Sequence, residues 1–205
     1  MTSGRFRTVM LSTVCVAWAL AAGTGLMRLW AYADRPAPSA AAPETWPAGT
    51  KLSRDPQRPT LVLFAHPQCP CSRATIGELS RLIARTQGRA AVHILFYRPA
   101  SAEAGWERTD LWRSAAAIPG VQVASDEDGR EAATFGALAS GQTLLYDAHG
   151  KLAFSGGITF ARGHSGDNAG LSALASLLNE GTAETRRTSV FGCLIRGSLA
   201  AASTP

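Results

Sequence analysis

The first thirty residues constrain this chain most, because they contain an uncharged stretch long enough to cross a lipid bilayer. Residues 8–27 carry no charged side chain. Twenty helical residues at about 1.5 Å each span roughly 30 Å, the thickness of a hydrocarbon core. Arg5 and Arg7 precede the stretch, and Trp30 and Tyr32 follow it, where amphipathic rings favour a membrane interface. Basic residues on the short N-terminal side predict that the N-terminus stays in the cytoplasm and that the chain after the apolar stretch is exported.

Residues 1–33 are therefore expected to form a cytoplasmic stub and a single-pass anchor in the inner (cytoplasmic) membrane. The alternative is a cleaved signal peptide, because Ala31-Tyr32-Ala33 before Asp34 has the small-x-small pattern of a cleavage site. The anchor is favoured because the apolar stretch is longer than the usual signal core of about 7–15 residues. Either way the following domain is expected in the periplasm or another extracytoplasmic space. Cys15 is interpreted as an apolar residue of the membrane segment without a chemical role.

The rest of the chain divides by composition into three parts. Residues 34–59 are rich in proline and alanine and predict a stiff, extended tether, since proline removes a donor and fixes φ. Residues 60–180 alternate apolar runs with amphipathic segments and predict the folded domain. Residues 181–205 form a C-terminal extension that contains Cys193.

The folded part predicts an α/β domain with a mixed sheet flanked by helices. A buried strand at 60–65, an amphipathic helix at 72–86 and a second strand at 91–97 form a β-loop-α-β unit, which implies parallel pairing. Further along, we expect helices at 107–117, 128–138 and 167–179, the last capped by Asp167, a strand at 121–124, and a hairpin of 142–147 with 151–155.

A cysteine pair lies between the first strand and its helix, in His66-Pro67-Gln68-Cys69-Pro70-Cys71. The thiolate is the nucleophile and soft-metal ligand, and its pKa falls at a helix N-terminus. His66 would lower the pKa further if it were close and protonated, and Pro70 stiffens the loop. A disulfide across one intervening residue is strained, and strain makes it labile. We therefore expect exchange chemistry at Cys69 and Cys71.

Cys193 is the third cysteine of the exported part, in the apolar run Val190-Phe191-Gly192-Cys193. It could resolve a mixed disulfide, form a structural disulfide or bind a metal. A buried small hydrophobe is an equally good interpretation.

His164 lies in a glycine-rich loop before the last predicted helix. With Cys69 and Cys71 it would make a soft ligand set suited to Cu(I) or Zn. An ordinary exposed loop histidine is the favoured interpretation, so no cofactor is expected and copper or zinc is the alternative.

The order of elements, with cysteines between the first strand and its helix, resembles the thioredoxin fold over roughly residues 58 to 180. Four motifs together resemble a small group of bacterial membrane proteins called RedB: His66-Pro67-x-Cys69-Pro70-Cys71, Ser155-Gly156-Gly157-Ile158, Ala161-Arg162-Gly163-His164 and Val190-Phe191-Gly192-Cys193.

Two features depart from thioredoxins. Their cysteines are spaced Cys-x-x-Cys, whereas here Ser72 stands three residues after Cys69. They carry a cis-proline before the third strand, and the matching position here is Gln142. A missing cis-proline leaves more room beside the cysteines for a ligand or a metal. Two cysteines with a distant histidine are similar to copper-delivery proteins of the Sco type, by functional analogy alone.

The resemblance implies a membrane-anchored thiol-disulfide oxidoreductase that acts on thiols or disulfides of exported proteins. Cys69 would attack and Cys71 would resolve, with Cys193 as a second candidate. The alternatives are a copper or zinc chaperone that uses Cys69, Cys71 and His164, and a non-catalytic scaffold. Nucleic-acid binding is not expected, because the net charge is only +5 and no run of Lys and Arg is interleaved with aromatics.

Overall fold

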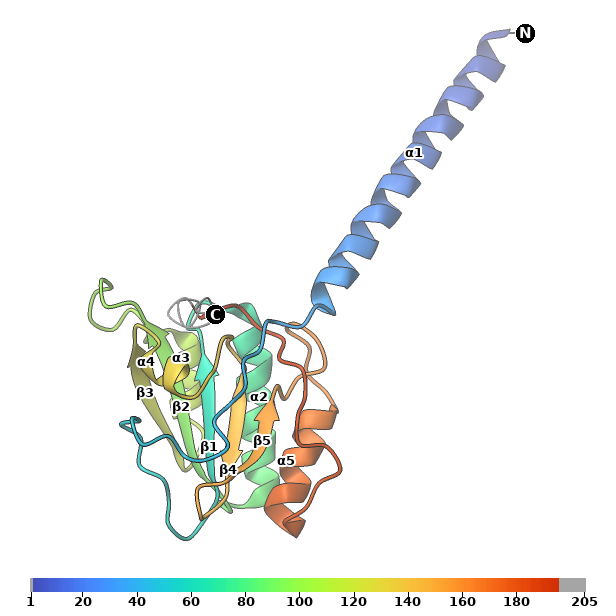
Figure 1. Cartoon of the computed structure of the whole chain (residues 1–205). Helices are drawn as coiled ribbons and strands as arrows, with labels where there is room; N and C mark the ends of the chain where they lie inside the picture. The colour runs from blue at the N-terminus through green and yellow to red at the C-terminus, as the bar shows by residue number, and fades with distance from the viewer. Residues whose placement is uncertain (1, 196–205) are drawn as a thin grey trace. The chain divides into compact units, whose positions relative to one another are not determined.

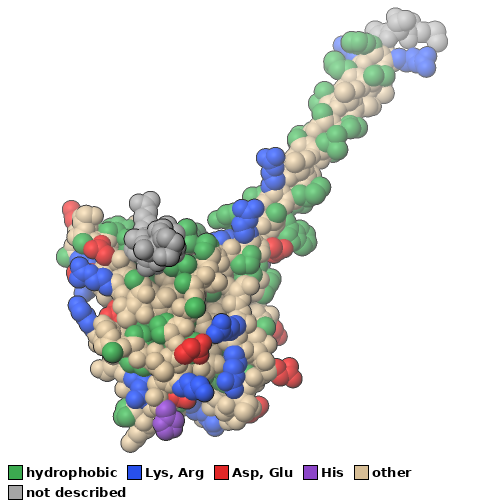
Figure 2. Space-filling view, in the orientation of Figure 1, with side chains coloured by type: hydrophobic (Ala, Val, Ile, Leu, Met, Phe, Trp, Pro, Cys, Tyr) green, Lys and Arg blue, Asp and Glu red, His purple; other side chains and the backbone are tan. Residues whose placement is uncertain are grey.

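The structure, a computed structural model, describes residues 2–195. It divides into two compact units, one ending at Arg35 and the other beginning at Pro36. The first unit is helix α1, Thr2–Ala33, whose hydrophobic side chains are exposed along its length (Figure 2). Its segment Gly4–Ala33 has a mean hydropathy of 1.8. This length and composition suit a membrane anchor, and they suit a signal sequence equally well.

The second unit is built on a five-stranded mixed sheet with the order β3-β2-β1-β4-β5 (Figure 1). The first three strands are parallel, β4 is antiparallel to β1, and β5 is antiparallel to β4. The strands are β1 Thr60–Ala65, β2 Ala91–Arg98, β3 Val121–Glu127, β4 Thr143–Tyr146 and β5 Leu152–Gly156. The predicted parallel unit and terminal hairpin are both confirmed.

The helices are α2 Pro70–Thr86, α3 Asp110–Ala116, α4 Arg130–Thr134 and α5 Ala169–Glu180. Helix α2 begins two residues before its predicted start, because proline fits the first helical position, where its missing N–H has no partner to lose. The cap predicted at Asp167 is wrong: the Asn168 side chain accepts the Leu171 N–H at 2.8 Å. Helices α3 and α4 are shorter than predicted.

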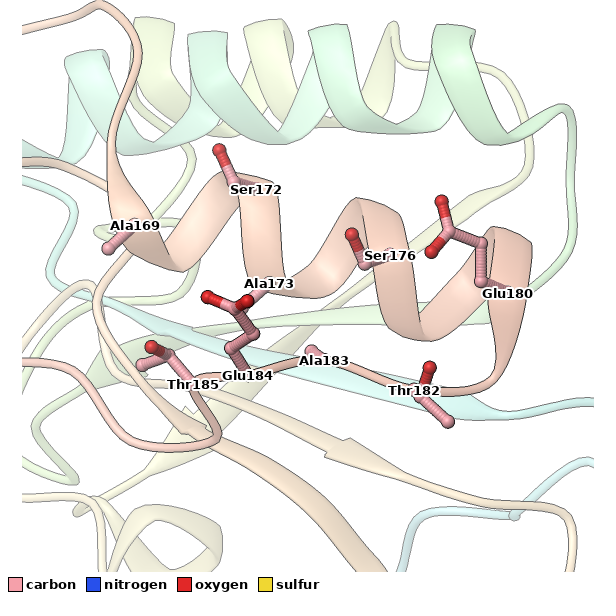
Figure 3. A pocket seen from close by; sticks show the side chains of 9 residues that line it. All are labelled: Ala169, Ser172, Ala173, Ser176, Glu180, Thr182, Ala183, Glu184 and Thr185. Carbon is pink, nitrogen blue, oxygen red and sulfur yellow. The ribbon is translucent and has the colours of Figure 1, made fainter.

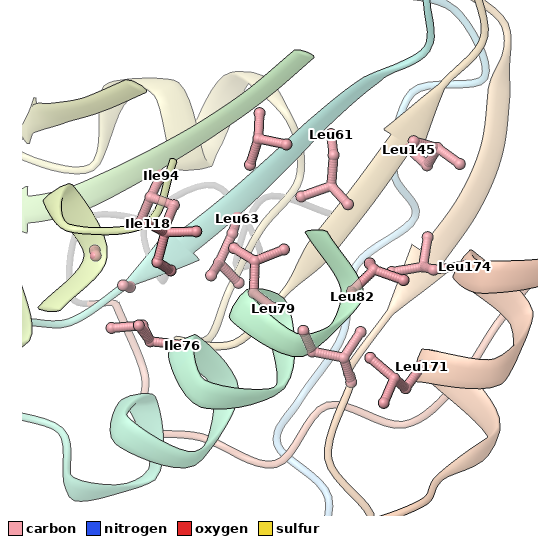
Figure 4. Packing of buried hydrophobic residues seen from close by; sticks show 14 of the residues in the cluster. Leu61, Leu63, Ile76, Leu79, Leu82, Ile94, Ile118, Leu145, Leu171 and Leu174 are labelled. Atoms are coloured by element: carbon pink, nitrogen blue, oxygen red, sulfur yellow. The ribbon is translucent and has the colours of Figure 1, made fainter. Parts of the chain in front are cut away.

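One face of the sheet packs against α2, α3 and α5. Leu61 and Leu63 of β1 contribute to this core, which also contains Leu79 from α2 and Leu174 from α5 (Figure 4). All four side chains are at most 1% exposed. Burial of this kind stabilises the fold by about 2 kcal/mol per side chain, and it fixes α2 on the end of β1.

The proline-rich segment covers part of the other face of the sheet, so it does not form the stiff, extended tether predicted for it. Val62 and Phe64 point to this face and need an apolar cover. Trp46 supplies part of it, with its ring 5.2 Å from that of Phe135 and 5.3 Å from that of Tyr146, both edge-on. The Tyr146 hydroxyl donates to the Pro43 carbonyl at 3.0 Å. The compact unit therefore begins at Pro36, before the domain start predicted at residue 60.

The C-terminal extension also packs on the domain as far as the structure describes it. The Ser155 N–H donates to the Arg186 carbonyl at 3.0 Å, and the Thr188 N–H donates back to the Ser155 carbonyl at 3.3 Å. A Cβ added at Gly156 would lie 2.2 Å from the Thr188 hydroxyl oxygen, and one at Gly157 would lie 2.6 Å from the Ser189 carbonyl oxygen. These glycines are therefore required by the close passage of the extension over β5.

Candidate functional site

The fold brings Cys69, Cys71 and Cys193 together at the N-terminus of α2. Cys69 is the residue before Pro70, in extended conformation, and Cys71 lies in the first turn of the helix. The sulfur atoms of Cys69 and Cys193 are 2.7 Å apart although the two residues are 124 positions apart in the chain. Cys69 is only 1% exposed, whereas the other two are partly exposed. A dithiol pair is thus formed between the α2 loop and the C-terminal extension.

The negative charge of this cluster is concentrated on Cys69. The hydrogen bond between the Cys69 and Cys193 side chains lowers the pKa of Cys69, and the backbone N–H groups of Cys193, Cys71 and Ser72 lower it further. Burial acts in the opposite direction. The pKa of Cys193 is raised by the same interaction and by burial. Cys69 is therefore the group that carries the thiolate, which is the state that a nucleophilic role requires.

Cys71 is held as a thiol. Burial is the largest effect on the pKa of Cys71 and raises it, and the charge of the neighbouring Cys69 raises it further. The Arg162 guanidinium opposes both effects. The same guanidinium donates to the Gly192 carbonyl at 2.6 Å, so one cation contacts both the α2 side and the extension side of the cluster. Arg162 was quoted from the sequence only as part of a motif; its proximity to Cys71 required the structure.

Hydroxyl groups fix the loop that carries Cys69 to the loop before β4. The Ser72 and Ser140 hydroxyl oxygens are 2.6 Å apart, and both side chains are buried. Ser140 accepts the His66 N–H at 2.9 Å, and Ser72 donates to the His66 carbonyl at 3.2 Å. Sequence analysis treated Ser72 only as a departure from Cys-x-x-Cys and did not single out Ser140. No local signal marks Ser140, because its partners are distant in sequence.

The His66 ring is engaged with aromatic neighbours. It stacks on Tyr97 with ring centroids 5.7 Å apart and meets the edge of Trp106 at 5.9 Å. Its Nδ1 accepts the Gln68 N–H at 3.2 Å. These contacts anchor the loop that precedes α2. The lowered pKa of Cys69 follows chiefly from the Cys193 thiol and backbone N–H groups.

Gln142 lies in the strand-entry position predicted for it, and its side chain is directed to β5. Its amide N–H donates to the Ser155 hydroxyl at 3.1 Å, and the residue is 2% exposed. It lines a cavity of about 100 Å³ together with residues 39–42, Leu152 and the extension, and no cysteine lines that cavity. The peptide bonds of the described residues are all trans.

His164 does not join the cysteines in a ligand cluster. Its ring packs on Phe160 with centroids 5.4 Å apart, and its Nδ1 pairs with the Arg162 carbonyl at 2.8 Å. Within residues 2–195, no group of three or more His, Cys, Asp or Glu side chains is arranged to hold a metal ion. The ligand set of Cys69, Cys71 and His164, which the sequence offered as the alternative, is therefore not assembled among the described residues.

A separate groove of about 630 Å³ lies between α5 and the segment that follows it (Figure 3). Ser172, Ser176 and Glu180 of α5 line it together with Thr182 and Glu184 of the following segment. Its lining contains no cysteine or histidine, so it lacks the chemistry of the cysteine cluster.

Comparison with known proteins establishes the fold and no family. No protein-family model matches the chain, and no curated protein matches it. Among solved structures, it is similar to an uncharacterized conserved protein from Geobacillus kaustophilus, with 17% identity, coverage of 78% of this chain and 95% of the other, and a TM-score of 0.61. A hypothetical protein from Sinorhizobium meliloti 1021 matches with 20% identity, coverage of 77% and 96%, and a TM-score of 0.59.

A weaker similarity, with a TM-score of 0.45, is found to an exposed lipoprotein thioredoxin from Streptococcus pneumoniae strain TIGR4, at 19% identity over 68% of this chain and 99% of the other. The order and directions of the strands, with α2 following β1 and the hairpin at the end, agree with the predicted fold class. The chain has a thioredoxin-like fold.

Proposed function

We propose that this chain is a thiol-disulfide oxidoreductase of the exported space, anchored by α1 and reacting through Cys69. The observation that carries the proposal is the 2.7 Å separation of the Cys69 and Cys193 sulfurs at the N-terminus of α2. A thiolate at a helix terminus with a thiol beside it is the arrangement that disulfide exchange uses.

The reaction proceeds in two exchanges. The Cys69 thiolate attacks one sulfur of a substrate disulfide, which forms a mixed disulfide and releases a substrate thiolate. A second cysteine of this chain, as its thiolate, then attacks Cys69, so that the substrate leaves fully reduced and the chain holds the new disulfide. The sequence predicts Cys71 as the resolving residue, and the geometry supports Cys193 at least as strongly. The reverse sequence oxidises a substrate dithiol.

The membrane location rests on α1. Its exposed apolar side chains and the basic residues Arg5 and Arg7 support an inner-membrane anchor with the domain on the exported side. The four sequence motifs support a relationship to the RedB group. The molecular mass of the chain in purified membranes tests the anchor: loss of residues 1–33 would show cleavage instead.

The exchange activity is tested by mixing the reduced full-length chain, in detergent, with oxidised glutathione and identifying the products by mass spectrometry. We expect Cys69→Ser to abolish the reaction and Cys15→Ser, which removes the exposed thiol of α1, to leave it unchanged. Equal rates for the parent chain and Cys69→Ser would contradict the proposal. Copper or zinc bound at one ion per chain and released by His164→Ala would favour the metal chaperone instead.

A further inference from the structure

The last described residues of the extension lie on an open backbone edge beside Cys69. The Ser140 N–H donates to the Cys193 carbonyl at 2.8 Å, and the Ile195 N–H donates to the Leu138 carbonyl at 2.9 Å. Ala139 and Leu194 form an antiparallel bridge. Residues 192–195 therefore add to residues 138–140 as a short extended strand, which is how many proteins bind an extended peptide.

This edge imposes different conditions on successive side chains. A Cβ at Gly192 would lie 1.8 Å from the Ser140 carbonyl oxygen, so the position accepts glycine alone without movement. Ile195 is 1% exposed and belongs to the apolar cluster of Phe64 and Phe135, whereas Leu194 is 37% exposed. The edge thus fits a glycine, then the reacting cysteine, then any residue, then an aliphatic side chain.

The extension is also held on the domain before this point. Residues 186–189 pass over Gly156 and Gly157 at the end of β5, and the Val190 carbonyl accepts the Ala37 N–H at 2.8 Å. Val190 is 2% exposed. Of the residues that the structure describes, 191–195 are the ones that must move to free the edge, so Cys193 stays at a high effective concentration when it leaves.

We propose that this edge is the substrate-binding site, that residues 192–195 are its internal occupant, and that its substrates are exported proteins with an extended Gly-Cys-x-aliphatic segment. This inference rests on the proposed function and specifies its substrate class. The substrate cysteine is part of a disulfide, and its segment replaces residues 192–195. The Cys69 thiolate attacks the sulfur of that cysteine, which breaks the substrate disulfide, releases its second sulfur as a thiolate and forms the mixed disulfide. Cys193 then returns as a thiolate, bonds to Cys69 and expels the substrate thiolate, which takes up a proton. Resolution and product release are thus coupled, because both segments need the same edge.

The test uses the full-length chain in detergent with Cys15→Ser, Cys71→Ser and Cys193→Ser, so that Cys69 is the single thiol. Its probes are three peptides, each with its cysteine activated as a mixed disulfide with an aromatic thiol. One has the sequence of residues 190–195, the second carries the Gly192→Ala replacement and the third the Ile195→Asp replacement. We expect the first peptide to react with Cys69 at least tenfold faster than the other two, which corresponds to about 1.4 kcal/mol.

A companion experiment weakens the internal occupant by adding Ile195→Asp to the protein itself. All three peptides should then react faster, and the order among them should persist. Equal rates for the three peptides would overturn the inference while leaving the proposed function intact. Failure of Cys69 to react with any peptide or with oxidised glutathione would instead refute the proposed function. The peptide comparison uses one and the same protein for all three peptides, so it needs no replacement of Gly192 or Ile195 in the chain itself.

Discussion

Replacement of Gly192 by alanine should uncouple Cys193 from Cys69. The new Cβ would lie 1.8 Å from the Ser140 carbonyl oxygen, and real Cβ atoms stay at least 3.0 Å from such an atom, so the extension must retreat. That movement breaks the hydrogen bond from the Ser140 N–H to the Cys193 carbonyl, at 2.8 Å, and the one from Arg162 to the Gly192 carbonyl, at 2.6 Å.

The size of the effect follows from these two bonds. A neutral hydrogen bond contributes about 1 kcal/mol, and one with a charged donor about 1.5–3 kcal/mol. In the reduced variant the retreated groups bond to water, and closing the Cys69–Cys193 disulfide desolvates them without restoring the two bonds. The disulfide of the variant should therefore be less stable by about 2–4 kcal/mol. For a two-electron couple, this raises the reduction potential by about 40–90 mV.

The potential is measured by equilibrating the full-length chain in graded glutathione buffers and quantifying the Cys69–Cys193 disulfide by mass spectrometry. Gly77→Ala is the matched control, since a Cβ at Gly77 meets nothing within 4 Å. Its potential should equal that of the parent chain. A Gly192→Ala potential that also equals the parent value would refute the role assigned to the extension.

Three further predictions concern the cluster and the core. Cys193→Ala removes the side-chain hydrogen bond that lowers the Cys69 pKa, so the pKa should rise and the alkylation of Cys69 should need a higher pH. Arg162→Gln removes the cation that opposes the raised pKa of Cys71, so alkylation of Cys71 at a fixed pH should slow. Trp46→Ala removes two edge-on ring contacts and should lower the free energy of unfolding, measured by denaturant titration, by about 2–3 kcal/mol.

Each of these predictions has a matched control. Cys15→Ser should leave the pH profile of Cys69 unchanged. Arg162→Lys keeps a positive charge and should restore part of the Cys71 reactivity. Trp18→Ala alters a tryptophan that is 73% exposed in α1 and should not change the stability of the domain. An unchanged pH profile in Cys193→Ala, or an unchanged Cys71 rate in Arg162→Gln, would contradict the charge distribution inferred for the cluster.

Local pattern was sufficient for the elements that position the cysteine loop. The apolar run at 60–65 and the helical spacing of residues 72–86 predicted β1 and most of α2, because burial dictates both periodicities. The loop cysteines were recognisable because they stand between those two elements. Their placement at a helix N-terminus follows directly from the chain order.

Long-range partners were not predictable from local pattern. Proline content correctly indicated that residues 34–59 form neither helix nor central strand. It carries no information on whether the second face of the sheet needs a cover, and that need decides where Trp46 packs. The proximity of Cys193 to Cys69 depends on the path of the extension over Gly156 and Gly157, which sequence analysis quoted as a motif without a structural reason.

The most direct test of the account is to map the cysteine pairing of the full-length Cys15→Ser chain across a glutathione redox series, with bound copper and zinc measured in the same samples. The account predicts a reversible two-electron change in which Cys69 pairs with Cys193, without stoichiometric metal. Three thiols that stay reduced throughout the series, or one metal ion per chain that protects them from labelling, would contradict it.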